Sequence, residues 1–217
     1  MLKLYYAPGA CSFVPHVALE MIKAATGDAF ETQIVKLHKG ENQAPDYLAL
    51  NPEGQVPVLI VDGKPLTQVI AICDYLNRRH PQLGLMPSDP AVQSEALSLF
   101  AWMNNTVHPT FTHVFLPQKF TDDDAAKDAL KRYNLLRYRG LLKRVSGLVE
   151  QAHPYLFGAK VSVLDIYAAM FLRWGGLAGI NPADYPEYKA YVDRIGTLPA
   201  VVAALERERM PLHNYKG

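Results

Sequence analysis

The sequence has few cysteines, no strong excess of either charge and no long apolar run. Only two of its 217 residues are cysteine, so a disulfide framework is excluded and a reducing, cytoplasmic location is expected. The 22 basic and 21 acidic side chains leave a net charge of +1, which argues against nucleic acid as a partner. No apolar run approaches the ~20 residues that span a bilayer, and the first residues lack the apolar region of a signal peptide. Glycine-rich phosphate motifs, Gly-x-Ser-x-Gly and the common metal-binding patterns are missing too, so nucleotide, hydrolase and metal sites are not expected.

The first part of the chain has the pattern of an α/β domain. Apolar residues 2–6 predict a buried strand that ends at the turn-forming residues 7–10. Apolar side chains at helical spacing predict a helix over residues 13–25, and residues 32–37 predict a second strand, so this β-α-β start favours a parallel pair. Further strands are expected at residues 56–61 and 65–68, on either side of the Asp62-Gly63 turn, and then a helix over residues 69–79.

The rest of the chain predicts helices only. Three prolines within residues 81–90 indicate a linker. Beyond it, residues 91–105 have helical periodicity, and the Thr121 hydroxyl followed by three acids predicts the start of a long helix. Ser162 and Asp165 form a capping-box pattern ahead of residues 166–174, which are apolar nearly all round. That last helix is therefore expected to be central and buried.

Cys11 has the strongest chemical signal, because it lies in the turn between a predicted strand and a predicted helix. Backbone N–H groups at a helix N-terminus stabilise an anion, and they lower the pKa of a thiol placed there. In a redox Cys-x-x-Cys pair the second cysteine would stand where Val14 stands, so an external thiol must complete any redox cycle. The alternative for Cys11 is a small buried residue that only packs, which is also the role expected of Cys73 in the middle of a helix.

Three other features carry weaker signals. Pro57 begins a segment with a strong strand pattern but has no N–H group to donate to a neighbouring strand. It therefore requires an edge of the sheet, or a cis bond that turns the Val56 backbone toward an extended ligand. His108 ends a helical stretch and is equally compatible with a functional and a structural histidine. Tyr167 and Trp174 lie seven residues apart on one helix face, and they either belong to the core or form an aromatic wall for an apolar ligand.

Together these segments resemble the glutathione transferase family, and most closely its bacterial beta class. The resemblance covers nearly the whole chain, in order. It is carried by residues 4–12 (LYYAPGACS), 51–59 (NPEGQVPVL) and 66–72 (LTQVIAI), by His108 with Phe111 and Phe115, by Ser162, Asp165 and Tyr167, and by Tyr191 and Arg194 ahead of residues 199–201.

The resemblance implies a fold and a domain plan. It implies a thioredoxin-like α/β domain over residues 1–80 that binds glutathione, a linker over residues 81–90, and an all-α domain over residues 91–217 with an apolar co-substrate site. It also implies a homodimer in the cytoplasm and a role in detoxification. Glutathione is then a co-substrate rather than a permanently bound cofactor, and no metal, membrane or nucleic acid is a partner. The family's reaction joins the glutathione sulfur to an apolar electrophile.

The resemblance also assigns the site residues. Catalysis falls to Cys11 and His108, and Cys11 favours thiol–disulfide and peroxide chemistry over conjugation. The glutathione-binding residues that it implies are Tyr6, Cys11, Lys39, Gln55, Val56, Pro57 in a cis bond, Gln68, Val69 and His108. The co-substrate residues that it implies are Ala10, Phe111, Phe115, Tyr167 and Trp174.

Two positions depart from the family pattern. Gln68 stands where an acidic residue is usual, so it lacks a charge for the amino group of glutathione. Val69 stands where a small or hydroxyl residue is common, which leaves only its backbone N–H to meet the γ-glutamyl carboxylate. These departures favour the alternative of a non-catalytic binding or regulatory protein with the same fold. A specialised glutathione-dependent enzyme, such as a dehalogenase or isomerase, is a third alternative that only substrate screening distinguishes. Retention on immobilised glutathione and an activity panel distinguish enzyme from binding protein.

Overall fold

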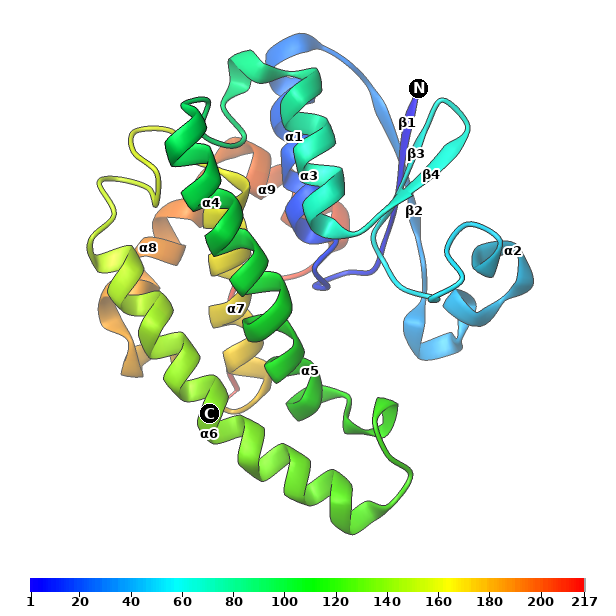
Figure 1. Cartoon of the computed structure of the whole chain (residues 1–217), viewed down its shortest axis with the longest axis vertical. Helices are drawn as coiled ribbons and strands as arrows, with labels where there is room; N and C mark the ends of the chain where they lie inside the picture. Colours follow the sequence, from blue (N-terminus) through cyan, green and yellow to red (C-terminus); the bar gives the residue numbers. More distant parts are fainter. Residues whose placement is uncertain (217) are drawn as a thin grey trace. The chain divides into compact units, whose positions relative to one another are not determined.

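The computed structural model describes residues 1–216, which form two compact units (Figure 1). The first unit consists of Met1–Ser88 with Thr197–Met210, and the second of Asp89–Gly196 with the residues from Pro211 onward. Helix α9 (Pro199–Glu208) therefore belongs with the beginning of the sequence, although it lies about 200 residues further along the chain. No helix within residues 1–216 combines the length and the apolar character that crossing a membrane requires.

The first unit is built on a four-stranded sheet. Its strands lie in the order β2-β1-β3-β4, with β1 and β2 parallel and the other neighbours antiparallel. The elements of this unit besides α9 are β1 (Leu2–Tyr6), α1 (Phe13–Thr26), β2 (Phe30–Ile34), η1 (Leu37–Lys39), η2 (Glu41–Gln43), α2 (Pro45–Leu48), β3 (Val58–Val61), β4 (Lys64–Thr67), α3 (Val69–Arg79) and η3 (Pro81–Leu83). This β-α-β-β-α order in a mixed sheet is the thioredoxin-like arrangement that the family resemblance implies.

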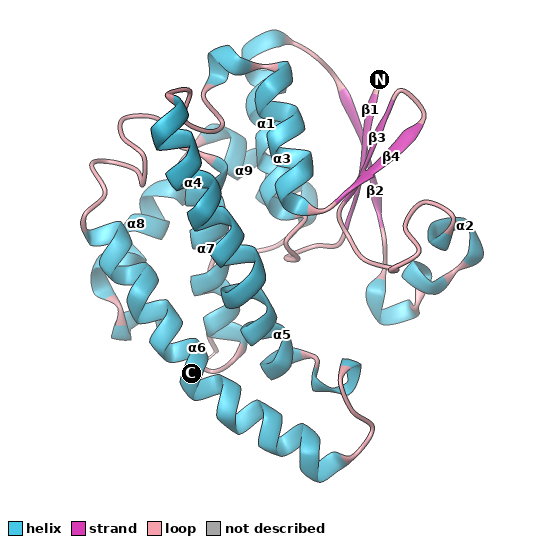
Figure 2. Ribbon diagram, in the orientation of Figure 1, coloured by secondary structure: helices cyan, strands magenta, loops and turns pink. Residues whose placement is uncertain are grey.

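Helices cover both faces of the sheet (Figure 2). Leu4 and Tyr6 of β1 are buried on the face covered by α1 and α3, and α9 packs against α1. Tyr5 points to the opposite face, where its ring meets that of Tyr47 from α2 with centroids 5.9 Å apart. Because side chains alternate along a strand, β1 contributes to two small cores at once. Since β1 is packed on both faces, the position of the loop that follows it is fixed where the strand ends.

The strand boundaries differ from those expected. The second strand was expected at residues 32–37 but runs from Phe30 to Ile34, because its five residues pair one to one with β1 and the ladder ends with β1. The third begins at Val58 rather than at residue 56, since Pro57 has no N–H group to give. The fourth is Lys64–Thr67, because Gln68 takes φ 72°, a left-handed value outside the range of strands. Helices α1 and α3 confirm the expected helices.

Within the part of the chain that the structure describes, the second unit has helices and no strand, apart from an isolated β-bridge between Tyr155 and Gly158. Its elements are α4 (Pro90–Trp102), a π-helical segment η4 (Met103–Val107), α5 (His108–Phe115), η5 (Pro117–Lys119), α6 (Asp124–Glu150), α7 (Val163–Leu177), η6 (Pro182–Asp184) and α8 (Pro186–Gly196). Helix α7 is the central one, because it contacts α4, α5, α6 and α8 and is buried along almost its whole length. This confirms the expectation from its apolar sequence.

Two helix starts in this unit were predicted from capping patterns. The start of α6 is capped by the Asp123 carboxylate, which accepts the Ala126 N–H at 2.6 Å, and not by the Thr121 hydroxyl. Thr121 lies too early to reach the first turn and bonds to the Asp123 N–H instead. The capping box at the start of α7 is confirmed, since Asp165 accepts the Ser162 N–H at 2.6 Å and both of its reciprocal bonds are present.

Candidate active site

The loop between β1 and α1 holds Cys11 at the start of a helix, as the sequence predicts. The chain turns at Gly9, whose φ of 72° suits a residue without a side chain. Ser12, fully buried, closes the loop: its hydroxyl accepts the Ala7 N–H and donates to the Ala7 carbonyl, each at 3.2 Å. Cys11 lies between these fixed points with 8% of its surface exposed. A thiol at this place is held still and stands beside the N-terminus of α1.

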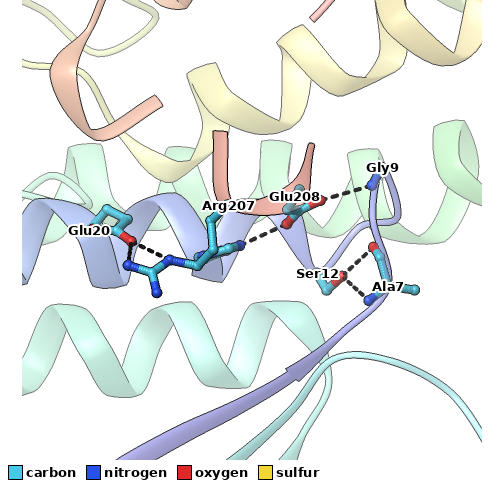
Figure 3. A network of polar contacts seen from close by, with 7 residues as sticks. Ala7, Gly9, Ser12, Glu20, Arg207 and Glu208 are labelled. Carbon is cyan, nitrogen blue, oxygen red and sulfur yellow. Dashed lines mark hydrogen bonds and ion pairs between the residues drawn. The ribbon is translucent and has the colours of Figure 1, made fainter. Parts of the chain in front are cut away.

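The loop is also tied to α9 through Glu208 (Figure 3). The Gly9 N–H donates to Oε2 of Glu208 at 2.9 Å, and Oε1 of Glu208 lies 2.7 Å from Nδ1 of His16 in α1. The side chains of His16 and Glu208 are completely buried. Arg207, the preceding residue, binds Glu20 of α1 through two nitrogens at 2.8 and 3.0 Å. A carboxylate from α9 therefore orients the backbone two residues before Cys11. The sequence alone did not predict these contacts, because Glu208 lies 192 positions after His16 and 199 positions after Gly9.

A second loop meets Cys11 from the side of β3. The thiol of Cys11 donates to the Val56 carbonyl at 3.5 Å, and the Val56–Pro57 bond is cis, as the resemblance implies. The carbonyl of the preceding residue, Gln55, accepts bonds of 2.8 Å from the Tyr47 hydroxyl and the Asn51 amide. Three of the residues expected to bind glutathione thus lie in one rigid turn next to the thiol.

The start of α3 carries backbone strain at an exposed position. Gln68 adopts φ 72° without being glycine, and no side chain caps the helix that begins at Val69. A non-glycine residue in this region is uncommon and marks strain that is concentrated at ligand sites. The N–H groups of the first turn are suited to an anion. The expected binding residues include Lys39, which is exposed in η1, and Tyr6, which is buried against His16 and whose pKa is raised mainly by that burial.

In the second unit, His108 stands at the junction of the π-helical segment and α5. Its Nδ1 atom lies 2.9 Å from the Tyr167 hydroxyl, and its ring packs on Trp174 with centroids 4.8 Å apart. Burial against these rings, with a smaller effect from the positive charge of Lys119, lowers the pKa of His108 to about 4. His108 is therefore a neutral imidazole at neutral pH, fixed in orientation by a tyrosine. Sequence reasoning found His108 and Tyr167 separately but not this contact.

The low pKa of His108 predicts an acid-dependent loss of stability. In the unfolded chain His108 takes up its proton near pH 6.5, and in the folded chain only near pH 4. Its contribution to stability is therefore complete above pH 6.5 and is lost as the pH falls toward 4, by up to about 3 kcal/mol. We expect His108→Gln to lose correspondingly less unfolding free energy than the parent protein between about pH 7 and pH 4.5. Urea titrations at both pH values measure this, and equal acid losses in the two proteins would contradict it.

Four aromatic residues of the second unit form one continuous column. Phe111 stacks on Phe115 at 5.4 Å and on Trp174 at 5.1 Å, with interplanar angles of 14° and 10°. Trp174 in turn meets the edge of Tyr167 at 6.1 Å. The column is buried except at Phe115, which is 50% exposed. The structure thus gathers four of the expected co-substrate residues, while the fifth, Ala10, lies in the Cys11 loop of the first unit.

The described residues show no metal site. Within residues 1–216, no three histidine, cysteine, aspartate or glutamate side chains come together in a group that could hold a metal ion.

Comparison with known proteins gives consistent matches along the chain. Family models described as "Glutathione S-transferase, N-terminal domain" and "Glutathione S-transferase, C-terminal domain" match residues 1–78 and 96–199. Glutathione S-transferase GST-4.5 of Xanthomonas campestris is 31% identical over 208 residues, which are 95% of this chain and 98% of the relative.

Two solved structures show the same similarity in three dimensions. One is a sphingomonad glutathione S-transferase complexed with glutathione, with a TM-score of 0.80 and 32% identity over 96% of this chain and all of that one. The other is a bacterial beta class glutathione S-transferase of Sphingomonas chungbukensis, with a TM-score of 0.81 and 33% identity over 96% and 100% of the two chains.

Proposed function

Since the chain belongs to the glutathione transferase family, we propose that it is an enzyme of the beta class that uses glutathione as its co-substrate. It transfers the glutathione sulfur to apolar electrophiles, and through Cys11 it reduces disulfides or peroxides at the expense of glutathione. The proposed setting is the bacterial cytoplasm and the proposed role is detoxification. No permanently bound cofactor takes part.

The observation that carries this proposal is the position of the Cys11 thiol. It stands at the N-terminus of α1, where oriented N–H groups favour a thiolate. Its loop is fixed by Ser12 and Glu208, and it touches the Val56 carbonyl in a turn that is fixed as well. These contacts fix Ala7 and Gly9 before Cys11 and place its thiol against the Val56 carbonyl, which supports a role for the thiol beyond packing.

The proposed exchange reaction needs only glutathione and a disulfide. The Cys11 thiolate attacks the glutathione sulfur of a mixed disulfide substrate, so that a Cys11–glutathione disulfide forms and the substrate leaves as a thiolate. A second glutathione thiolate then attacks this disulfide, releases oxidised glutathione and restores the Cys11 thiolate. The absence of a cysteine at position 14, where valine stands, supports this route, because no internal thiol competes with glutathione in the second step.

The proposed binding roles come from the family resemblance and use residues of the first unit. We assign the cysteinyl backbone of glutathione to Val56, the γ-glutamyl carboxylate to the first N–H groups of α3 beside Gln68, and the glycine carboxylate to Lys39. The strained backbone at Gln68 and the uncapped helix start support the second assignment. The aromatic column from Phe115 to Tyr167 supports an apolar co-substrate.

We further propose that the protein works as a homodimer, as members of this family do. Sedimentation of the purified chain at micromolar concentration is expected to give about twice the mass of the 24.2 kDa polypeptide. A monomer under these conditions would contradict the proposed assembly but not the proposed chemistry.

The function is tested by binding and by turnover separately. The protein is passed over immobilised glutathione, and its activity is measured with an aromatic halide, an organic hydroperoxide and a glutathione mixed disulfide. We expect retention and the highest turnover with the mixed disulfide. Retention without turnover of any substrate would replace the enzyme by a glutathione-binding protein, and absence of both would overturn the proposal.

A further inference from the structure

Two side chains of the first unit bind the same backbone carbonyl. The Tyr47 hydroxyl and the Nδ2 amide group of Asn51 both donate to the Gln55 carbonyl, each at 2.8 Å. Both residues are buried, with 6% and 5% of their surfaces exposed. A carbonyl oxygen has two lone pairs, so this one is fully occupied, and both donors come from the segment 45–51 that contains α2.

The orientation of the Asn51 amide is fixed by its two partners. Its Oδ1 atom accepts the Glu53 N–H at 3.2 Å, and its Nδ2 atom meets the Gln55 carbonyl, which can only accept. If the amide were turned over, its oxygen would face the Gln55 carbonyl and its nitrogen would face the Glu53 N–H. The amide therefore satisfies both partners in one orientation only.

The bonds to the Gln55 carbonyl also decide the direction of the next N–H group. The peptide bond between Gln55 and Val56 is trans, and in a trans peptide the C=O and N–H groups point in opposite directions. With the carbonyl held toward Tyr47 and Asn51, the Val56 N–H is directed away from them. Within residues 1–216 this N–H donates to no other group, so it can meet a ligand.

Further contacts keep the same turn in place. Gly54, with φ 60°, has no room for a Cβ atom, which would lie 2.5 Å from Nε2 of Gln43 and 2.9 Å from the Asn42 carbonyl. The Gly54 carbonyl accepts the Asn42 amide at 2.8 Å. At the other end of the turn, the Val56 carbonyl accepts the Cys11 thiol. The Val56 backbone is thus fixed at its carbonyl by the thiol and at the preceding peptide by the α2 segment.

We propose that Tyr47 and Asn51 are positioning residues for glutathione, which hold the peptide before Val56 so that its N–H faces the cysteinyl carbonyl of the ligand. This inference rests on the proposed function, which assigns the cysteinyl backbone of glutathione to Val56. The direction of the donor is set before the ligand arrives, so less of the backbone has to be ordered on binding.

The contribution of the two side chains is measured by calorimetric titration with S-methylglutathione, which keeps the peptide backbone and cannot form a disulfide with Cys11. Tyr47→Phe removes one donor and keeps the ring. Asn51→Asp keeps the acceptor for the Glu53 N–H and replaces the other donor by an oxygen. We expect the Kd to rise about 5-fold in each variant and more than about 10-fold in the double variant.

Turnover distinguishes positioning from a merely structural role. With an aromatic halide or an organic hydroperoxide as second substrate, we expect the KM for glutathione to rise with the Kd, while kcat and the KM for the second substrate stay within about 2-fold. A loss of kcat at unchanged Kd and unchanged KM for glutathione would overturn the proposal, because it indicates only a smaller folded fraction.

Tyr5→Phe is the matched control for Tyr47→Phe. The two rings pack against each other with centroids 5.9 Å apart, so both changes are made in the same small core. The Tyr5 hydroxyl has no hydrogen-bond partner within residues 1–216. Its removal should therefore leave the Kd and the KM unchanged, and an equal rise in both variants would show that the effect comes from the core and not from the Gln55 carbonyl.

Crystal structures without ligand test the position of the peptide itself. In the double variant the Gln55 carbonyl has lost both donors, so we expect this peptide to be turned over, with the carbonyl directed away from α2. A peptide that keeps its direction in the double variant would overturn the positioning role, even where binding weakens. If the parent protein does not bind S-methylglutathione, the proposed function fails, and the unliganded structures still decide whether the two side chains hold the peptide.

Discussion

Replacing Cys11 with alanine is expected to abolish both the mixed disulfide with glutathione and the disulfide-reductase activity. In the parent protein, incubation with oxidised glutathione should attach one glutathionyl group, seen by mass spectrometry and removed by a reductant. The only other thiol of the chain, Cys73, lies fully buried in α3, and burial raises its pKa, so it remains protonated and cannot replace Cys11. Binding of glutathione should be largely kept, because the remaining assigned contacts involve the Val56 backbone, Lys39 and the start of α3.

Cys73→Ala is the matched control for this experiment. It removes the other thiol and is expected to leave the adduct and the reductase activity at the level of the parent protein. An adduct that maps to Cys73, or full reductase activity in Cys11→Ala, would remove Cys11 from the mechanism. Activation of the glutathione sulfur would then fall to Tyr6, Ser12 or His108.

The second large effect is expected from Asp165→Ala, through stability rather than chemistry. The Asp165 carboxylate is fully buried and accepts the Ser162 N–H at 2.6 Å, the Leu156 N–H at 2.8 Å and the Tyr191 hydroxyl. Each buried donor left without an acceptor costs about 1–3 kcal/mol. We therefore expect the free energy of unfolding to fall by about 3–5 kcal/mol, measured as a shift of the urea midpoint at unchanged slope.

The stability loss in Asp165→Ala is compared with the losses in two further variants. Ser162→Ala removes only the cap hydroxyl and should cost about 0.5–2 kcal/mol. Asp128→Ala, at an exposed position of α6, should change stability by less than about 0.5 kcal/mol. Equal losses in Asp165→Ala and Ser162→Ala would show that Asp165 acts only as a helix cap and not as the acceptor that also joins Leu156 and α8 to α7.

Local patterns predict the elements of this fold well, and partners from distant segments set their boundaries. The apolar spacing of α1 and α3 is a property of each segment, so both helices were found. The second strand begins two residues and ends three residues before the predicted positions, because its start depends on pairing with Leu2 and its end on where β1 stops. The cap of α6 was assigned to Thr121 instead of Asp123, since both side chains are suitable and only the helix start decides between them.

The candidate site likewise contains residues that local sequence predicts and residues whose roles depend on distant parts of the chain. Cys11 was predictable because its chemistry follows from a strand-to-helix turn, which local sequence reveals. Glu208 was not, because its partners Gly9 and His16 are nearly the whole chain away from it. The contact of His108 with Tyr167 spans 59 residues and depends on the π-helical turn before α5, for which the sequence carried no recognised signal. Long-range polar contacts of this kind require the packed structure.

The contact between Gly9 and Glu208 makes the order of synthesis matter for the thiol. The two residues are 199 positions apart, so at about 5–20 residues per second the ribosome reaches Glu208 about 10–40 s after it has made Gly9. Throughout that interval the Cys11 loop exists without the carboxylate that orients it, and α1 lacks the helix that packs against it. A chain that stops before residue 208 carries the cysteine but lacks the carboxylate that accepts the Gly9 N–H. The contact that orients the loop before Cys11 can therefore form only after α9 has been synthesised. Until then, the chain carries the Cys11 thiol in an incomplete site.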